Sequence, residues 1–401
     1  MKQKMLRWTA ILLAVLFLPS WLFVNTAAQE DVAETEDSVP VTEFGVEDSS
    51  LSLNCKSAIL MEATTGTVLY TQNAEEALPP ASVTKIMTLL LVMEEIDAER
   101  VRLDDTVTVS ANAASMGGSQ VYLKEGEQMT VEDLLKSVVI ASANDAAVAL
   151  AEHVAGSVSV FVDKMNAKAR ELGMTATCFE NVTGLDDTAE RHLTSAKDIA
   201  LMSQALLGHP TVLQYSSIWM DTIRDGAFGL TNTNRLVRFY RGCTGLKTGS
   251  TSKAGFCVSV TAERDGFSLI CVIMGAESGD SRNAAATQLL DWGFANYGLY
   301  RAQEGCTEPI PVTGGVSDFC ETEYSSFTKV LPKSDLKTVE TRFSVPESLA
   351  APIRAGEALG RVEYLSGKKV LGSVEVRAAK AVEKINFFTI FGRMVAKFLL
   401  I

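Results

Sequence analysis

The stretch Lys247-Thr248-Gly249-Ser250-Thr251 contains a Lys-Thr-Gly triplet that occurs once in the chain. Two segments rich in apolar and β-branched residues follow it, 255–262 and 267–274, and the dipeptide Asp265-Gly266 joins them. Such segments are typical of strands, and Asp-Gly favours a two-residue hairpin turn. We therefore expect the triplet to lie just before two adjacent antiparallel strands.

Upstream of the triplet, short strands come first and helices follow. Residues 58–62 and 68–70 are predicted strands, separated by a turn at Thr64-Thr65-Gly66. Capping signals and helical periodicity then predict helices over 82–96, 130–140, 145–154, 161–172 and 284–297. Strands on both sides of a helical middle indicate an α+β fold, in which a mixed sheet carries a helical insert that forms one wall of a cleft.

Serine motifs precede the triplet. Serine lies three residues before lysine at Ser82/Lys85, Ser250/Lys253, Ser326/Lys329, Ser334/Lys337 and Ser366/Lys369, and Ser-x-Asn occurs at Ser110-Ala111-Asn112 and Ser142-Ala143-Asn144. One match alone is weak, but only Ser82/Lys85 comes before both Ser-x-Asn candidates and the Lys-Thr-Gly triplet. Ser142-Ala143-Asn144 lies between two expected helices and can face a cleft. Ser110-Ala111-Asn112 is interpreted as a surface turn, and Asp145 as a helix cap rather than a catalyst.

The spacing of Ser82 and Lys85 suits nucleophilic catalysis. A serine hydrolase without a triad histidine needs another base, and a lysine one helical turn away can supply it if its pKa is lowered. Residues at i and i+3 share one helix face. Ser82 also lies at the expected helix start, where backbone N–H groups and the helix dipole favour developing negative charge. Ser82 is therefore the expected nucleophile.

Together these motifs resemble the low-molecular-mass penicillin-binding proteins of the D-alanyl-D-alanine carboxypeptidase type. Further matching stretches are Gly184-Leu185-Asp186-Asp187, Thr194-Ser195-Ala196-Lys197-Asp198, Asn232-Thr233-Asn234-Arg235-Leu236 and Ala254-Gly255 after the triplet. The resemblance implies a β-lactamase/DD-peptidase-like domain, a small all-β domain and a C-terminal amphipathic helix. It also implies an enzyme that removes the terminal D-alanine from peptidoglycan stem peptides through an acyl-enzyme on Ser82, and that β-lactams inhibit covalently.

The resemblance also implies a role for each site residue. Lys85 would take the serine proton, Ser142 would relay a proton to the leaving amine, and Lys247 would keep the local field positive. Asn144 would bind the substrate peptide group, Thr248 and Arg282 its terminal carboxylate, and the N–H groups of Ser82 and Ser250 would form the oxyanion hole. Gly249 is also expected among the substrate-binding residues.

The two ends of the chain predict export and membrane attachment. Residues 1–28 have the basic, apolar and small-residue regions of a signal peptide, although the apolar run is also long enough for an uncleaved anchor. Residues 29–50 are expected to form a flexible leader, 51–300 the catalytic domain and 301–380 a small β-rich domain. Residues 381–401 are predicted to form an amphipathic helix with a polar stripe of Asn386, Thr389, Arg393 and Lys397. We expect it to lie on the membrane at the outer face, packing on its own domain being the alternative.

Composition excludes several other functions. The net charge of -13 argues against nucleic-acid binding, and the three histidines show no metal-ligand spacing, so neither metal nor cofactor is expected. The seven cysteines are too few for a disulfide scaffold. In the expected hairpin Cys271 pairs with Val260 and Cys257 lies on the other face, which argues against a bridge between these two cysteines.

Three other functions remain open at this point. A β-lactamase shares the motifs, but its Glu-x-x-Leu-Asn element has only a near match at Glu190-Arg191-His192-Leu193-Thr194. An inactive wall-binding protein would not need the full catalytic set. An endopeptidase or transpeptidase would form the same acyl-enzyme, and the sequence does not show whether water or an amine accepts the acyl group.

Overall fold

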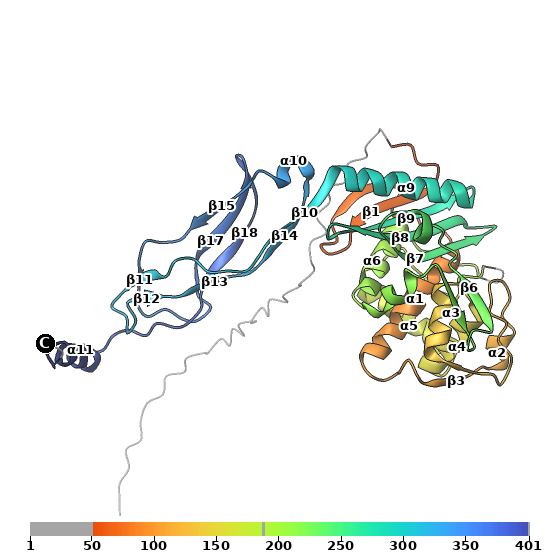
Figure 1. Cartoon of the computed structure of the whole chain (residues 1–401), viewed down its shortest axis with the longest axis horizontal. Coiled ribbons are helices and arrows are strands. Elements are labelled where there is room, and N and C mark those ends of the chain that lie inside the picture. The colour runs from red at the N-terminus through yellow and green to blue at the C-terminus, as the bar shows by residue number, and fades with distance from the viewer. Residues whose placement is uncertain (1–50, 187–188, 400–401) are drawn as a thin grey trace, which may run out of the picture. The chain divides into compact units, whose positions relative to one another are not determined.

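The computed structural model describes residues 51–186 and 189–399 (Figure 1). The expected signal peptide, residues 1–28, and the leader, residues 29–50, lie outside the described residues. The same holds for Asp187 in one of the matching stretches.

A five-stranded antiparallel sheet carries the Lys-Thr-Gly triplet on an edge strand. Its strand order is β2-β1-β9-β8-β7, with β1 Ser57–Glu62, β2 Val68–Gln72, β7 Cys243–Thr251, β8 Gly255–Arg264 and β9 Phe267–Ala276. Asp265 and Gly266 join β8 to β9 with φ of 53° and 73°, the left-handed values of a type I′ hairpin turn. Cys271 pairs with Val260, which confirms the predicted register.

Both faces of this sheet are buried. Successive side chains of a strand point to opposite faces, so neighbouring residues of one strand enter different cores. Leu60 and Ile273 pack under helix α9, Gly279–Asn296, which covers one face (Figure 1). Ile59 and Val272 belong to the core on the other face, toward the helical middle of the chain. The α+β fold predicted from the order of strands and helices is therefore confirmed, but the expectation of a mixed sheet is wrong, because every strand pair in this sheet is antiparallel.

The helical middle consists of helices and two short hairpins. The helices are η1 Ala81–Thr84, α1 Lys85–Asp97, α2 Ala111–Ala114, α3 Val131–Val139, α4 Asn144–Ala155, α5 Val158–Glu171, α6 Ala196–Leu207, α7 Thr211–Ser216 and α8 Leu236–Phe239. The hairpins pair β3 Thr106–Thr108 with β4 Gln128–Thr130, and β5 Met220–Ile223 with β6 Phe228–Thr231. Thr130 caps α3 as predicted, since its hydroxyl accepts the N–H of Asp133 at 3.1 Å.

Three local predictions need correction. The helix expected from Ser82 starts as the 3-10 turn η1, and α1 begins only at Lys85. Ser110 is not in a turn: it caps the one-turn helix α2, because its hydroxyl accepts the N–H of Ala113. Asp145 is not a cap, because Ala143 holds that position and the Asp145 carboxylate is used by another loop.

The C-terminal part of the chain is rich in β-strands, as expected. It contains β10 Tyr297–Ala302, β11 Ile310–Thr313, β12 Phe319–Cys320, β13 Thr322–Tyr324, β14 Phe327–Pro332, α10 Lys333–Leu336, β15 Val339–Ser344, β16 Leu349–Ala350, β17 Ala358–Ser366 and β18 Lys369–Ala378. Its main sheet has the order β13-β18-β17-β15. Phe327 stacks on the buried Tyr364 with 4.4 Å between their ring centroids. Both belong to a small hydrophobic core within this C-terminal part.

The last described helix, α11, covers Phe387–Leu399. It begins at Phe387 rather than at Ala381, because Val382 and Lys384 form β-bridges with Ile353 and Gly315. Within the described ranges no single helix is long and apolar enough to cross a membrane; α4 and α5 meet that test only as a pair bent by 84°.

Candidate active site

Lys85 brings three parts of the chain together at one buried amine. Its Nζ lies 3.0 Å from Ser82 Oγ, 2.6 Å from Asn144 Oδ1 and 2.8 Å from the carbonyl oxygen of Thr183. The side chain is fully buried. Ser82 and Lys85 meet because they lie one turn apart, whereas Asn144 reaches them from the first turn of α4. Serine, lysine and asparagine of the first two motifs therefore form one hydrogen-bonded cluster.

Burial makes both lysines of the motifs weaker cations than usual. The pKa of Lys85 falls well below its usual value, first because burial disfavours the charged form and second because Lys247 repels it, whereas Asp145 acts in the opposite direction. The pKa of Lys247 falls to about 7, mainly through burial and also through repulsion by Arg282. The site therefore lowers the cost of keeping an amine neutral beside Ser82.

The edge strand β7 lies directly against the backbone of Ser82. A methyl group built on Gly249 would come within 2.7 Å of the Ser82 nitrogen and 2.9 Å of both the Pro80 oxygen and the Val83 nitrogen. Only glycine therefore permits this close approach. Ser250, the next residue of this strand, is exposed to solvent.

Thr233 connects the loop that contains Ser142 to strand β7. Ser142 lies between α3 and α4 with a left-handed φ of 61° and is 4% exposed. The preceding Ile140 carbonyl accepts the N–H of Thr233 at 3.0 Å, and the Thr233 hydroxyl accepts a hydrogen bond from Thr248 at 2.8 Å. Thr233 thus joins the loop that contains Ser142 to Thr248 of β7.

Arg282 is held by contacts outside this cluster. It belongs to the first turn of α9, is 7% exposed, and donates to the Cys257 carbonyl at 3.5 Å and to Asn283. Among the described residues no hydrogen bond joins Arg282 to Thr248. Its charge nevertheless acts on Lys247, whose pKa it lowers.

The buried Asp145 organises the loop in front of Asn144. Its carboxylate accepts the N–H groups of Val121 at 3.1 Å and Leu123 at 3.0 Å, in addition to that of Ala146 in its own helix. Tyr122, between the two loop donors, has a left-handed φ of 58°, which turns both N–H groups toward one carboxylate. Asp145 therefore holds a loop rather than capping a helix.

Other contacts of the site were not predicted from the sequence. The Thr183 carbonyl that binds Lys85 belongs to a turn in which Asn181 Oδ1 accepts the N–H groups of Thr183 and Gly184. His192 binds the hydroxyl of Thr84 at 2.8 Å. Gly184 was part of a matching stretch, but a backbone acceptor leaves no side-chain signature, so only the clustering of Asn and Gly pointed to this turn.

The alternative motif copies are engaged elsewhere. Ser110 and Asn112 both bind Glu152, at 2.6 and 2.8 Å. Lys253 donates to the Asp186 carbonyl at 2.6 Å, and Lys329 donates to the Leu371 carbonyl. None of these contacts reproduces the Ser82–Lys85 pair.

The cysteines near the triplet are not activated nucleophiles. All seven cysteines are free thiols. Burial raises the pKa of Cys243 to about 11 and also raises the pKa of Cys257. Because the thiolate is the reactive form, both thiols are expected to be inert at neutral pH.

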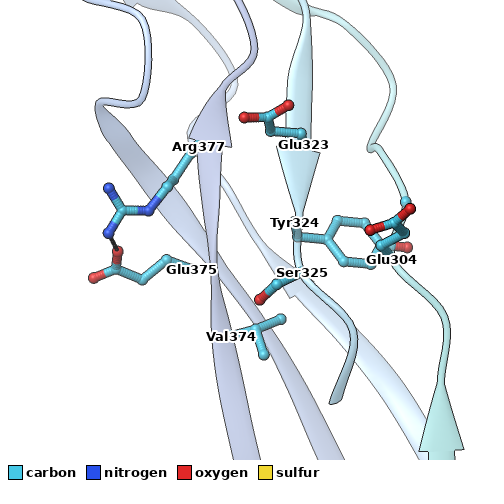
Figure 2. Close-up of a pocket in the computed structure, with 8 residues that line it drawn as sticks. Glu304, Glu323, Tyr324, Ser325, Val374, Glu375 and Arg377 are labelled. Atoms are coloured by element: carbon cyan, nitrogen blue, oxygen red, sulfur yellow. Dashed lines mark hydrogen bonds and ion pairs between the residues drawn. The ribbon is translucent and has the colours of Figure 1, made fainter. Parts of the chain in front are cut away.

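A hollow with a volume of about 770 Å³ lies in the β-rich C-terminal part (Figure 2). Glu304, Glu323, Tyr324 and Ser325 line it, and Glu375 and Arg377 form an ion pair at its edge. No serine–lysine pair lies among its lining residues, so this hollow lacks the chemistry seen at Ser82.

Comparison with known proteins agrees with this geometry. The D-alanyl-D-alanine carboxypeptidase family matches residues 44–278, and the C-terminal domain of penicillin-binding protein 5 matches residues 324–384. The chain is 40% identical over 357 residues to D-alanyl-D-alanine carboxypeptidase DacF of Bacillus subtilis (strain 168), covering 87% of this chain and 91% of that protein.

Solved structures show the same similarity. Penicillin-binding protein 5 from Haemophilus influenzae superposes with a TM-score of 0.73 at 28% identity, covering 83% of this chain and 99% of that one. Penicillin-binding protein D2 from Listeria monocytogenes, solved with ampicillin bound, has a TM-score of 0.56 at 33% identity and covers 61% of this chain and 99% of its own. The half-buried Ser82 and the buried Lys85 thus lie in a chain that belongs to the D-alanyl-D-alanine carboxypeptidase family of serine peptidases.

Proposed function

We propose that Ser82 is the nucleophile of this serine carboxypeptidase and that Lys85 is its general base. The hydrogen bonds of Lys85 carry the proposal. Carbonyl oxygens only accept hydrogen bonds, so Asn144 Oδ1 and the Thr183 oxygen take up two N–H bonds of the amine. In the neutral amine the remaining lone pair then faces the Ser82 hydroxyl at 3.0 Å. This geometry suits removal of the serine proton.

Acylation follows from this arrangement. Ser82 Oγ attacks the carbonyl between two D-alanines while its proton passes to Lys85, and the tetrahedral oxyanion accepts the N–H groups of Ser82 and Ser250. Collapse breaks the C–N bond, and the proton held by Lys85 is relayed through the Ser142 hydroxyl to the nitrogen of the leaving D-alanine, so that both side chains return to their starting state. Water then hydrolyses the ester and regenerates Ser82.

The charged and polar side chains of the cleft bind the substrate. Asn144 is placed to bind the substrate peptide group, and repulsion by Lys247 adds to burial in lowering the pKa of Lys85. Thr248 binds the terminal carboxylate, and Arg282 adds a positive charge that attracts it. The substrates are peptidoglycan stem peptides ending in D-Ala-D-Ala. β-Lactams, one of which is bound in the Listeria monocytogenes relative, acylate Ser82 in the same way.

The decisive experiment measures D-alanine release from a peptide ending in D-Ala-D-Ala, with and without penicillin. Ser82→Ala is expected to abolish release and penicillin labelling. Ser326→Ala is the matched control, because this exposed serine belongs to another Ser-x-x-Lys sequence. Full release by Ser82→Ala would refute the assignment, and rapid turnover of penicillin would instead indicate a β-lactamase.

A transpeptidase reaction is the second candidate. The observation that favours it is the similarity to the DD-transpeptidase of Streptomyces K15, at 28% identity and a TM-score of 0.56. Added glycine would then divert the acyl group into a new peptide. We propose water as the main acceptor, so the hydrolysed product should exceed the aminolysed one.

We further propose that the enzyme acts outside the cytoplasmic membrane, attached to its surface by α11. Phe387, Phe388 and Phe398 of this helix are 72–82% exposed, which suits insertion into a membrane interface. Replacing Phe388 and Phe398 with serine should abolish binding of the full chain to phosphatidylglycerol vesicles. Phe319→Ser, a 54% exposed control outside α11, should leave binding unchanged. Unaltered binding of the double variant would refute this attachment.

A further inference from the structure

The turn that carries Ser82 has a strained backbone. Ala81, directly before Ser82, has a left-handed φ of 49°, a conformation that is unfavourable for a residue with a Cβ atom. Such a conformation persists only where surrounding contacts enforce it. The Ala81 carbonyl shows two of these contacts: it accepts the Thr84 hydroxyl at 2.8 Å, and it packs against Gly184, where an added methyl group would lie 1.8 Å from its oxygen.

The Thr84 hydroxyl has a second partner, His192. The imidazole Nε2 lies 2.8 Å from Thr84 Oγ1, and Nδ1 accepts the backbone N–H of Glu180 at 3.0 Å. The ring is 5% exposed and packs edge-on against Phe179 at 5.7 Å.

These contacts define the tautomer of His192. Thr84 has one hydroxyl proton, and the Ala81 carbonyl, which can only accept, takes it. Thr84 Oγ1 must therefore accept from His192, which places a proton on Nε2. Nδ1 must be unprotonated to accept from Glu180. Both ends of the chain of hydrogen bonds require the same neutral imidazole, so the direction of every bond from Glu180 to Ala81 is determined.

We propose that His192 is a positioning residue for the carboxypeptidase reaction, which orients the Thr84 hydroxyl and thereby holds the Ala81 carbonyl and the Ser82 turn in place. The inference rests on the proposed assignment of Ser82 as nucleophile. His192 acts through Thr84: within the described residues it forms no hydrogen bond with Ser82 or Lys85. Because Nε2 already carries a proton and Nδ1 accepts the N–H of Glu180, neither ring nitrogen is available to accept the serine proton.

The loop from Asn181 to Gly184 also positions Lys85, the proposed general base. The turn formed by Asn181 presents the Thr183 carbonyl to Lys85 and places Gly184 against Ala81. His192 ties the Thr84 hydroxyl of the Ser82 turn to the backbone at Glu180, one residue before this loop. Loss of the His192 donor should therefore shift Ser82 relative to Lys85 without removing either group.

Two substitutions separate the donor from the acceptor of the ring. His192→Gln can keep an N–H near the Nε2 position, whereas His192→Asn can keep an acceptor near Nδ1 but loses the donor to Thr84. We expect kcat for D-alanine release to fall about tenfold in His192→Asn, with KM changed less than about twofold, and to fall less than about threefold in His192→Gln. His153→Asn, at an exposed site, is the control and should match the parent enzyme.

Thermal unfolding distinguishes positioning from simple stability. The inference is overturned if both substitutions lower kcat equally, if kcat follows Tm alone, or if His192→Asn retains full activity. Thr84→Val provides a second test, because its effect on kcat and that of His192→Asn should not add in the double variant. Failure of the Ser82 assignment would look different: Ser82→Ala would then release D-alanine whatever residue stands at 192.

Discussion

Replacing Gly249 with alanine should disable the enzyme while leaving it folded. The added methyl group would lie 2.7 Å from the Ser82 nitrogen, and its next neighbours, the Pro80 oxygen and Val83 nitrogen at 2.9 Å, are also backbone atoms. None of these can rotate away. Relative to an ordinary contact of about 3.4 Å, the strand must move by about 0.7 Å (3.4 − 2.7) from Ser82.

This displacement acts directly on the proposed oxyanion hole. A misplacement of about 1 Å can cost about a hundredfold in rate, and loss of one oxyanion donor about 10² to 10³. We therefore expect kcat/KM for D-alanine release to fall by about 10² to 10³. Overpacking of this kind destabilises a fold by about 1–3 kcal/mol, which should lower Tm by only a few degrees.

The assay compares Gly249→Ala with the parent enzyme in D-alanine release, penicillin labelling and thermal unfolding. Gly229→Ala is the control, because a methyl group on this strand glycine meets no atom within 4 Å. Near-normal kcat/KM in Gly249→Ala would refute the reasoning, since it would show that the strand can retreat without disturbing the Ser82 N–H. Complete loss of folding would contradict the expected stability.

Other substitutions test the buried charges. Lys85→Met should abolish penicillin labelling but leave Tm equal or higher, because it removes a buried amine; a lower Tm would contradict this. Asp145→Asn keeps one acceptor oxygen for three N–H groups. The free energy of unfolding measured in urea should therefore fall by about 1–3 kcal/mol. Lys247 binds its proton less tightly in the folded state, with a pKa of about 7 instead of 10.5. The stability of the parent enzyme therefore rises with pH between about 7 and 10.5. Lys247→Met should be most stabilising below pH 7 and progressively less so toward pH 10.5. A difference in stability between variant and parent that stays constant with pH would count against the lowered pKa.

Features determined by local spacing could be predicted from the sequence. The interval between Ser82 and Lys85 places both on one turn, and their Oγ and Nζ atoms lie 3.0 Å apart. The Asp265-Gly266 turn set the register in which Cys271 faces Val260. Both depend on a few neighbouring residues and on regular helix or hairpin geometry.

Features that depend on distant backbone groups could not be predicted. Lys85 is held by the Thr183 carbonyl, 98 positions away, and Thr84 by His192, 108 positions away. Every residue type offers a carbonyl, so the Thr183 acceptor has no recognisable residue pattern. The role of Asp145 was misjudged for a related reason: at a helix start a carboxylate resembles a cap, and only the tertiary structure shows that the Val121–Leu123 loop uses it instead.

The dependence on backbone acceptors also explains how a buried lysine can be a base here. A side-chain carboxylate beside Lys85 would favour the ammonium form and raise its pKa. The neutral acceptors Asn144 Oδ1 and the Thr183 oxygen orient the amine without adding a negative charge, and the nearest acidic influence, Asp145, is partly neutralised by loop N–H groups. Repulsion by Lys247 then acts in the same direction as burial. The lysine is thus directed toward Ser82 by uncharged groups, so that orientation and a low pKa are compatible in one site.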